Sequence, residues 1–199
     1  MIDAKKIGQR IAEAIANEPG PCFYPGKFKP PHKGHYAAAT ELAQRDYIKQ
    51  VNVVISRKTI DGITPEDSLM IWHMYLKAEP NPKITVKIST DESPIQTIIK
   101  YLKNNPTVNP VYVAVGDDEV DDEAYGNSLQ QQFGDRVKVI PVREKAGDIS
   151  APHVRNVLAS GDFEEFAEAV PEAAYNKGFA PKIFKMLGTK VKGNAPEQA

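Results

Sequence analysis

The chain has 199 residues, of which 41% are hydrophobic and 26% are charged, and its formal net charge is −1. This length suits one full-sized core, and the composition is that of a globular protein rather than a disordered one. Proteins that bind along nucleic acid or acidic membranes usually carry a clear basic excess, so the balanced charge disfavours both partners. The single cysteine, Cys22, excludes an intrachain disulfide and a cysteine metal cluster.

The N-terminal residues mix acidic and basic side chains, and the chain holds no run of about 18 apolar residues, as a membrane-spanning helix needs. No secretory signal is expected, and the sequence predicts a cytoplasmic protein. We expect a single domain over 1–190, with an N-terminal helix at 3–17, a core at 20–160 and C-terminal helices within 161–188. A disordered tail is expected over 191–199. The sequence does not fix the oligomeric state, and a homo-oligomer is compatible with it.

In chain order, the spacing of apolar residues predicts strands that alternate with helices. After the N-terminal helix, further helices are predicted over 34–45, 65–77, 95–102 and 128–133. The predicted strands cover 22–24, 51–55, 83–88, 111–115 and 137–142. The last quarter is predicted to be helical over 151–160, 163–169, 171–178 and 181–187. This alternation predicts an α/β protein: a parallel sheet of about five strands, with helices on both faces and a helical C-terminal region.

The junction between the first strand and the next helix carries the densest set of functional side chains. It reads Gly26-Lys27-Phe28-Lys29-Pro30-Pro31-His32-Lys33-Gly34-His35. In a parallel sheet this junction lies at the carboxyl edge of the strands, and a helix start attracts anions. His32 and His35 lie on nearly the same helix face, so both could donate to one phosphate. Lys27 and Lys29 add positive charge, and Gly34 would let a base or ribose lie against the helix.

A bare His-x-x-His pattern is also compatible with a surface pair or half of a zinc site, although no third clustered ligand supports zinc. In its place between a strand and a helix, however, the segment resembles the Gly-x-Phe-x-Pro-x-His-x-Gly-His signature of the nucleotidyltransferase superfamily. The fixed positions are met by Gly26, Phe28, Pro30, His32, Gly34 and His35. The resemblance covers roughly residues 20–175 and implies a Rossmann-like fold.

A second motif follows the last predicted strand and reads Ile149-Ser150-Ala151-Pro152-His153-Val154-Arg155. Ser150 is placed to cap a helix, and the exposed N–H groups there, with Arg155 one turn in, would hold phosphates. A capped helix with a solvated arginine is the alternative. The segment resembles the family motif Ile-Ser-Ser/Thr-Thr-x-x-Arg, in which these groups stabilise the departing pyrophosphate. Ala151 and Pro152 replace its two hydroxyl residues, and His153 is either a new donor or merely exposed.

Two further loops lie at the same sheet edge. Arg57 and Lys58 follow the second strand and could meet an acceptor phosphate; the family likeness favours Lys58, with a solvated loop as the alternative. Gly116 and Asp118 resemble the Gly-x-Asp of some adenylyltransferases, in which the acid contacts the ribose or base edge, and a solvated acidic loop is again the alternative. The family often has an arginine early in the helix at 65–77, where this chain has Ser68.

The resemblance therefore implies a nucleotidyltransferase that moves a nucleoside monophosphate from a nucleoside triphosphate to a small phosphorylated acceptor and releases pyrophosphate. Mg²⁺ would arrive on the triphosphate rather than at a protein metal site. The implied catalytic residues are His32, His35, Lys58 and Arg155. The implied nucleotide and phosphate contacts are Gly26, Lys27, Phe28, Lys29, Gly34, Gly116, Asp118, Ile149, Ser150 and Arg155, with Arg57 and Lys58 at the acceptor.

The choice of substrates rests on a finer likeness. The residues around Phe28 resemble those of nicotinamide-mononucleotide adenylyltransferases, which favours ATP and a mononucleotide acceptor. The first alternative is a cytidylyltransferase that uses CTP and a phosphorylated alcohol or sugar. The second alternative is a non-catalytic nucleotide-binding module.

Overall fold

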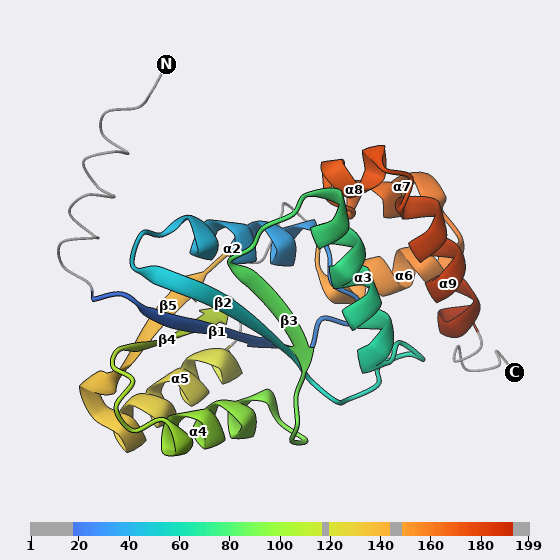
Figure 1. Ribbon diagram of the computed structural model, residues 1–199. Coiled ribbons are helices and arrows are strands. Elements are labelled where there is room, and N and C mark those ends of the chain that lie inside the picture. Colours follow the sequence, from blue (N-terminus) through green and yellow to red (C-terminus); the bar gives the residue numbers. More distant parts are fainter. Residues whose placement is uncertain (1–17, 117–119, 144–148, 193–199) are drawn as a thin grey trace, which may run out of the picture.

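The computed structural model describes residues 18–116, 120–143 and 149–192 (Figure 1). At its centre lies a five-stranded sheet in the order β3-β2-β1-β4-β5, and all neighbouring strands are parallel. The strands are β1 (Gly20–Gly26), β2 (Ile48–Ile55), β3 (Ile84–Ile88), β4 (Val111–Gly116) and β5 (Val137–Val142). The prediction of an α/β, Rossmann-like parallel sheet of about five strands is confirmed.

Helices cover both faces of this sheet (Figure 1). They are α2 (Lys33–Gln44), α3 (Pro65–Ala78), α4 (Pro94–Asn104), α5 (Val120–Phe133), the 3₁₀ turn η1 (Gly134–Arg136), α6 (Ala151–Ser160), α7 (Phe163–Glu168), α8 (Glu172–Asn176) and α9 (Ala180–Lys192). Helices α2 and α3 lie on one face and α4 and α5 on the other, while α6 to α9 form a group beside α3. No helix within the described ranges combines the length and apolar character needed to cross a bilayer.

The central strand β1 shows why its residues form a buried strand. Cys22 and Tyr24 face the core under α2 and α3, whereas Phe23 faces the core under α4 and α5, as side-chain alternation requires. Burial raises the pKa of the Cys22 thiol to about 12, so this cysteine stays protonated and serves as a small apolar residue.

Helix α3 shows how a local signal fixes a boundary. Thr64 is its N-cap and accepts a hydrogen bond from the Asp67 N–H, Asp67 accepts in return from the Thr64 N–H, and Pro65 takes the first helical position. This capping box and Pro65 set the start of α3 where the sequence predicts it.

Three boundaries differ from the predictions by three residues or more. Strand β2 begins at Ile48, three residues before the predicted start. Helix α5 begins at Val120 rather than near 128, because an acidic run is compatible with a helix N-terminus even where apolar periodicity is missing. Helix α9 continues to Lys192, which corrects the tail predicted over 191–199, since Val191 packs into the core. The helix predicted at 3–17 and the rest of the tail lie outside the described residues, and the single domain over 1–190 stays a prediction.

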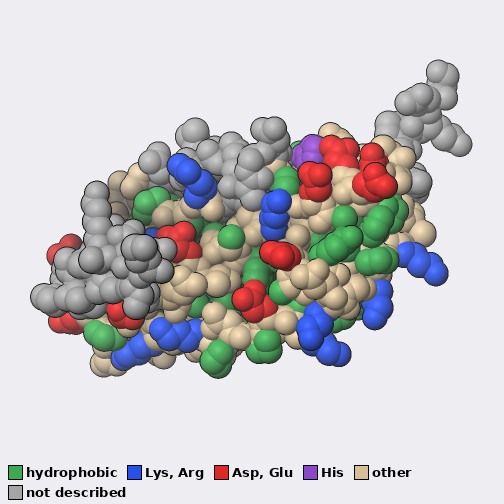
Figure 2. All heavy atoms as spheres, turned by 90° about the horizontal axis from the view of Figure 1, so that it is seen from above, with side chains coloured by type: hydrophobic (Ala, Val, Ile, Leu, Met, Phe, Trp, Pro, Cys, Tyr) green, Lys and Arg blue, Asp and Glu red, His purple; other side chains and the backbone are tan. Residues whose placement is uncertain are grey.

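Charged side chains of both signs are distributed over the face seen in Figure 2. Acidic groups lie beside basic ones there, with apolar and polar side chains between them, so the basic groups on that face do not merge into one surface. A strong attraction for a phosphate at this face is therefore expected to come from local geometry rather than from a broad field.

Candidate active site

The β1–α2 junction places both predicted histidines in the first turn of α2. His32 is the N-cap, and its Nδ1 accepts a hydrogen bond from the Gly34 N–H at 3.2 Å. His35 Nδ1 accepts one from the His32 N–H, also at 3.2 Å. The two imidazole ring centroids are 3.7 Å apart. The side chains therefore lie on one face of α2, as their spacing predicts.

Both imidazoles are neutral near neutral pH. Burial lowers the pKa of His32 to about 4. Burial and the neighbouring His32 hold the pKa of His35 well below its ordinary value. Because each Nδ1 accepts a backbone N–H, the proton of each neutral ring lies on Nε2, which makes Nε2 a donor. The first motif thus offers two uncharged N–H donors at a helix N-terminus, a setting that suits an anion.

Phe28 shapes the loop that leads to the histidines. Its buried ring lies edge-on to His35 and Trp72, at centroid distances of 5.0 and 5.6 Å. Its backbone φ is 51°, in the left-handed region, and the Ser68 hydroxyl donates to its carbonyl at 2.6 Å. A Cβ on Gly26 would lie 2.6 Å from the Phe28 ring, so this position requires glycine. In the described contacts, Gly26 and Phe28 form the loop, and the Ser68 hydroxyl supports it.

Lys29 is the fully buried cation of this loop, with 0% of its surface exposed. Its Nζ donates to the carbonyls of Lys27 at 3.0 Å and of Ser56 at 3.3 Å. Burial lowers the pKa of Lys29 to about 8, and the negative charges of Glu66 and Asp67 oppose that shift. The ammonium therefore links the first motif to the end of β2. The sequence predicts a phosphate contact for Lys29 and does not predict this structural contact.

Helix α6 brings the second motif to the same place. Ser150 is its N-cap and accepts a hydrogen bond from the His153 N–H at 3.3 Å. Arg155 Nη1 donates to the Lys29 carbonyl at 2.8 Å, and Arg155 Nε lies 2.6 Å from Asp61 Oδ2. Because Lys29 belongs to the first motif, the guanidinium and the paired histidines lie on the same side of the molecule.

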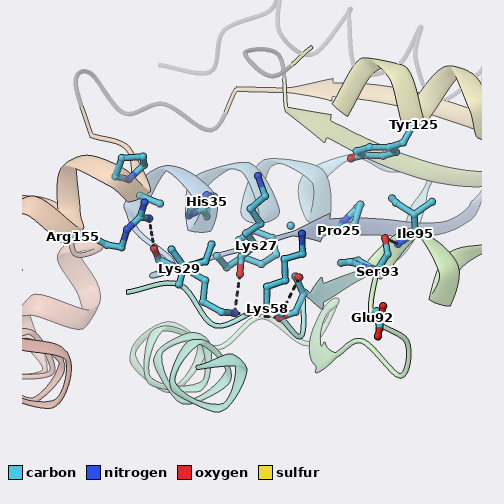
Figure 3. A pocket seen from close by; sticks show the side chains of 17 residues that line it. Pro25, Lys27, Lys29, His35, Lys58, Glu92, Ser93, Ile95, Tyr125 and Arg155 are labelled. Atoms are coloured by element: carbon cyan, nitrogen blue, oxygen red, sulfur yellow. Dashed lines mark hydrogen bonds between the residues drawn. The ribbon is translucent and has the colours of Figure 1, made fainter. Parts of the chain in front are cut away.

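The two motifs border one cavity of about 380 Å³ at the carboxyl edge of the sheet (Figure 3). His35 and Arg155 lie towards one end of it. Lys27 and Lys58 occupy the middle, where both side chains point the same way. At the other end lie side chains from β1, the start of α4 and α5, namely Pro25, Glu92, Ser93, Ile95 and Tyr125.

Some predicted residues are not among the described residues that line the cavity. They are His32, Arg57, Gly34, Gly116, Ile149 and Ser150. Arg57 and Lys58 are both exposed, and of the two only Lys58 lines the cavity. His153 Nε2 lies 3.4 Å from Glu165 Oε1 on α7, so its side chain is on the outer surface. Asp118 lies outside the described residues.

The sequence pattern missed three parts of the site. The start of α4 and Tyr125 form the far end of the cavity, and Asp61 contacts Arg155. Asp61-Gly62 is a recognisable turn signal, but a turn signal does not say which distant side chain the turn will meet.

Comparison with known proteins identifies the fold. No family model and no curated protein matches the sequence. Two solved complexes of the Plasmodium falciparum nicotinic acid mononucleotide adenylyltransferase, one with APC and one with NaAD, each align with a TM-score of 0.61 over 84% of this chain and 98% of that chain. The chain has the fold of these adenylyltransferases. The identities are 14% and 15%, so the likeness to the adenylyltransferase is a likeness of fold. The activity has to be argued from the site.

Proposed function

We propose that the chain is a nucleotidyltransferase that transfers AMP from ATP to a small phosphorylated acceptor, such as a mononucleotide, and releases pyrophosphate. The observation that carries the proposal is the contact between the two motifs. Lys29 and Arg155 are 126 residues apart in sequence and share a hydrogen bond beside a cavity that His35 also lines. A neutral N–H donor from His35, with the His32 ring 3.7 Å from it, and a guanidinium at one cavity form a suitable receptor for a polyphosphate.

In the proposed reaction, an oxygen of the acceptor phosphate attacks the α-phosphorus of the triphosphate. The bond from the α-phosphorus to the bridging oxygen breaks on the opposite side, and pyrophosphate leaves with those electrons. His32 and His35 stabilise the growing charge through Nε2–H, while Lys27 and Arg155 hold the β- and γ-phosphates. Catalysis of this kind depends on positioning and electrostatics, and no covalent intermediate is needed.

Lys58 lies between the two ends of the cavity, where it would meet the acceptor phosphate (Figure 3). Beyond it, the ring of Tyr125 and the side chains of Pro25 and Ile95 offer flat and apolar surfaces. Such a lining suits a planar base better than a phosphorylated alcohol or sugar, which favours a mononucleotide acceptor. The solved neighbours are named for nicotinic acid mononucleotide, in keeping with that choice. A cytidylyltransferase with CTP remains the alternative.

Mg²⁺ would reach this site bound to the triphosphate. Within the described ranges, no group of three or more His, Cys, Asp and Glu side chains is placed to hold a metal ion. Phosphate oxygens and water would supply most of its ligands, as they commonly do for Mg²⁺. Bound in this way, the ion would neutralise part of the phosphate charge.

The proposal is tested by measuring pyrophosphate release for ATP, CTP, GTP and UTP, each combined with a panel of acceptors. The panel comprises nicotinamide and nicotinic acid mononucleotides, pantetheine phosphate, flavin mononucleotide, a phosphorylated alcohol and a sugar phosphate. We expect turnover with ATP and a mononucleotide. Turnover with CTP and a phosphorylated alcohol or sugar would establish the cytidylyltransferase instead, and triphosphate binding without pyrophosphate release would establish the non-catalytic module.

A further inference from the structure

Arg155 is fixed by two contacts that lie outside its own motif. Nη1 donates to the Lys29 carbonyl at 2.8 Å, and Nε donates to Asp61 Oδ2 at 2.6 Å. A guanidinium has five N–H hydrogens, and the described part of the chain gives the other three no acceptor. Those three are therefore available to a ligand in the cavity that Arg155 lines.

Asp61 is presented by a tight turn in the loop between β2 and α3. Asp61 and Gly62 have φ values of 49° and 77°. Ile60 and Ile63 exchange both backbone hydrogen bonds, at 3.2 and 2.9 Å. This is the pattern of a two-residue type I′ turn, for which Asp-Gly is a preferred sequence. Ile63 is fully buried and Ile60 lines the cavity, so the turn is anchored on both sides of the carboxylate.

The start of α6 gives Arg155 little help with a phosphate. Ala151 and Pro152 stand where the family pattern has two hydroxyl residues, and Pro152 also lacks a backbone N–H. The His153 N–H is already bonded to the Ser150 hydroxyl. Arg155 would therefore make a larger share of the contacts with a leaving pyrophosphate. The orientation of its guanidinium matters more here than in a site where two hydroxyl groups also bind the phosphates.

We propose that Asp61 is a positioning residue that orients the Arg155 guanidinium towards the β- and γ-phosphates. The inference rests on the proposed function and names a residue that the motifs do not contain. Asp61 does not touch the substrate; it acts by accepting the hydrogen bond from Arg155 Nε. This role requires a side-chain oxygen that accepts the hydrogen bond from Arg155. Asparagine at position 61 should therefore preserve the function, whereas a residue without a side-chain oxygen should not.

The turn at Asp61 tolerates two variants that together test this role. Asp61→Asn keeps the acceptor oxygen and removes the charge, and Asp61→Gly removes the side chain. Both are expected to fold, because Asn-Gly and Gly-Gly are also preferred type I′ sequences. Glu41→Gln is the matched control, since it removes an exposed carboxylate that pairs with Arg45 at 3.3 Å on α2, outside the cavity.

The readouts are the affinity for inorganic pyrophosphate by titration calorimetry, and kcat and KM for pyrophosphate release. Misplacing a guanidinium should weaken pyrophosphate binding and lower kcat in Asp61→Gly by roughly 10-fold or more, without raising KM for the acceptor. Asp61→Asn should stay within about threefold of the wild type, because its oxygen still orients Arg155. In an Arg155→Ala background, Asp61→Gly should have no further effect, because the two residues act as one unit.

Three results would overturn the inference: wild-type binding and turnover in Asp61→Gly, an equally large loss in Asp61→Asn, or losses that multiply when Asp61→Gly and Arg155→Ala are combined. Pyrophosphate titration does not depend on turnover. If the wild type binds pyrophosphate but transfers no nucleotide to any acceptor, the proposed function fails, while the comparison of variants still decides the role of Asp61. If the wild type does not bind pyrophosphate, both proposals fail.

Discussion

His32 provides a test of the neutral histidine pair that needs no substrate. His32 is 3% exposed, and burial lowers its pKa to about 4. The substitution His32→Asn removes the titrating group but retains a good N-cap, since asparagine accepts hydrogen bonds from the first-turn N–H groups of a helix. Comparing the wild type with His32→Asn therefore measures the effect of protonating His32 on stability, without the effect of losing the N-cap.

The direction of the pKa shift determines whether the protein gains or loses stability as the pH falls. Because the folded pKa lies below the unfolded value of 6.5, protons bind more tightly to the unfolded chain, and stability is lost as pH falls from 6.5 towards 4. At pH 5 the unfolded imidazole is almost fully protonated, while His32 in the folded protein is protonated in about a tenth of molecules. Integrating this difference from pH 7.5 to pH 5 gives a loss of about 2 kcal/mol in the free energy of unfolding.

Urea unfolding of both proteins at pH 7.5 and pH 5 measures this loss. Other groups titrate in both proteins, so the difference between the two losses is the quantity of interest. We expect the wild type to lose about 2 kcal/mol more than His32→Asn. His35 is buried beside His32 and shifts in the same direction, so it adds to the loss in both proteins. Equal losses would show that His32 is not held neutral by burial, and the description of the pair as uncharged donors would be wrong.

The remaining predictions concern catalysis and the loop. His35→Ala should lower turnover by roughly 100-fold or more in the pyrophosphate-release assay, as loss of a donor to a transition state does, and near-normal turnover would refute its role. Lys58→Gln should raise KM for the acceptor more than KM for ATP, whereas Lys49→Gln, a charge-matched change at an exposed position of β2, should leave both unchanged. Gly26→Ala should destabilise the fold by roughly 1–3 kcal/mol in urea unfolding, because the new methyl group would overlap the Phe28 ring; unchanged stability would show that the loop yields freely.

The sequence predicts the parts of this site that depend on near neighbours in the chain. His32 and His35 are three residues apart at a helix start, so helix geometry alone brings their rings together. Ser150 caps α6 for the same kind of local reason. The parallel pairing of the strands is also accessible from the alternation of strands and helices, because a helix between two strands carries the chain back to pair in the same direction.

The parts that could not be predicted depend on contacts between distant segments. Lys29 looks like a further phosphate-binding cation in the sequence, yet its ammonium is buried against the Ser56 carbonyl at the end of β2. Asp61 and Arg155 are 94 residues apart, and no local pattern connects a turn after β2 with a side chain on α6. Such contacts follow from how the loops at the sheet edge fold over one another, which hydrophobic periodicity does not describe.

The backbone itself indicates where this molecule needs a fixed geometry. Among the described residues, Phe28 and Asp61 are the non-glycine positions with φ in the left-handed region. Conformations of this kind cost of order 1 kcal/mol and persist where the surroundings over-determine them. Phe28 is held by the Ser68 hydroxyl, and Asp61 by the paired hydrogen bonds of its turn. Arg155 donates to Asp61 and to the carbonyl of the residue after Phe28, so both strained positions lie beside the one guanidinium that the proposed reaction assigns to the leaving group.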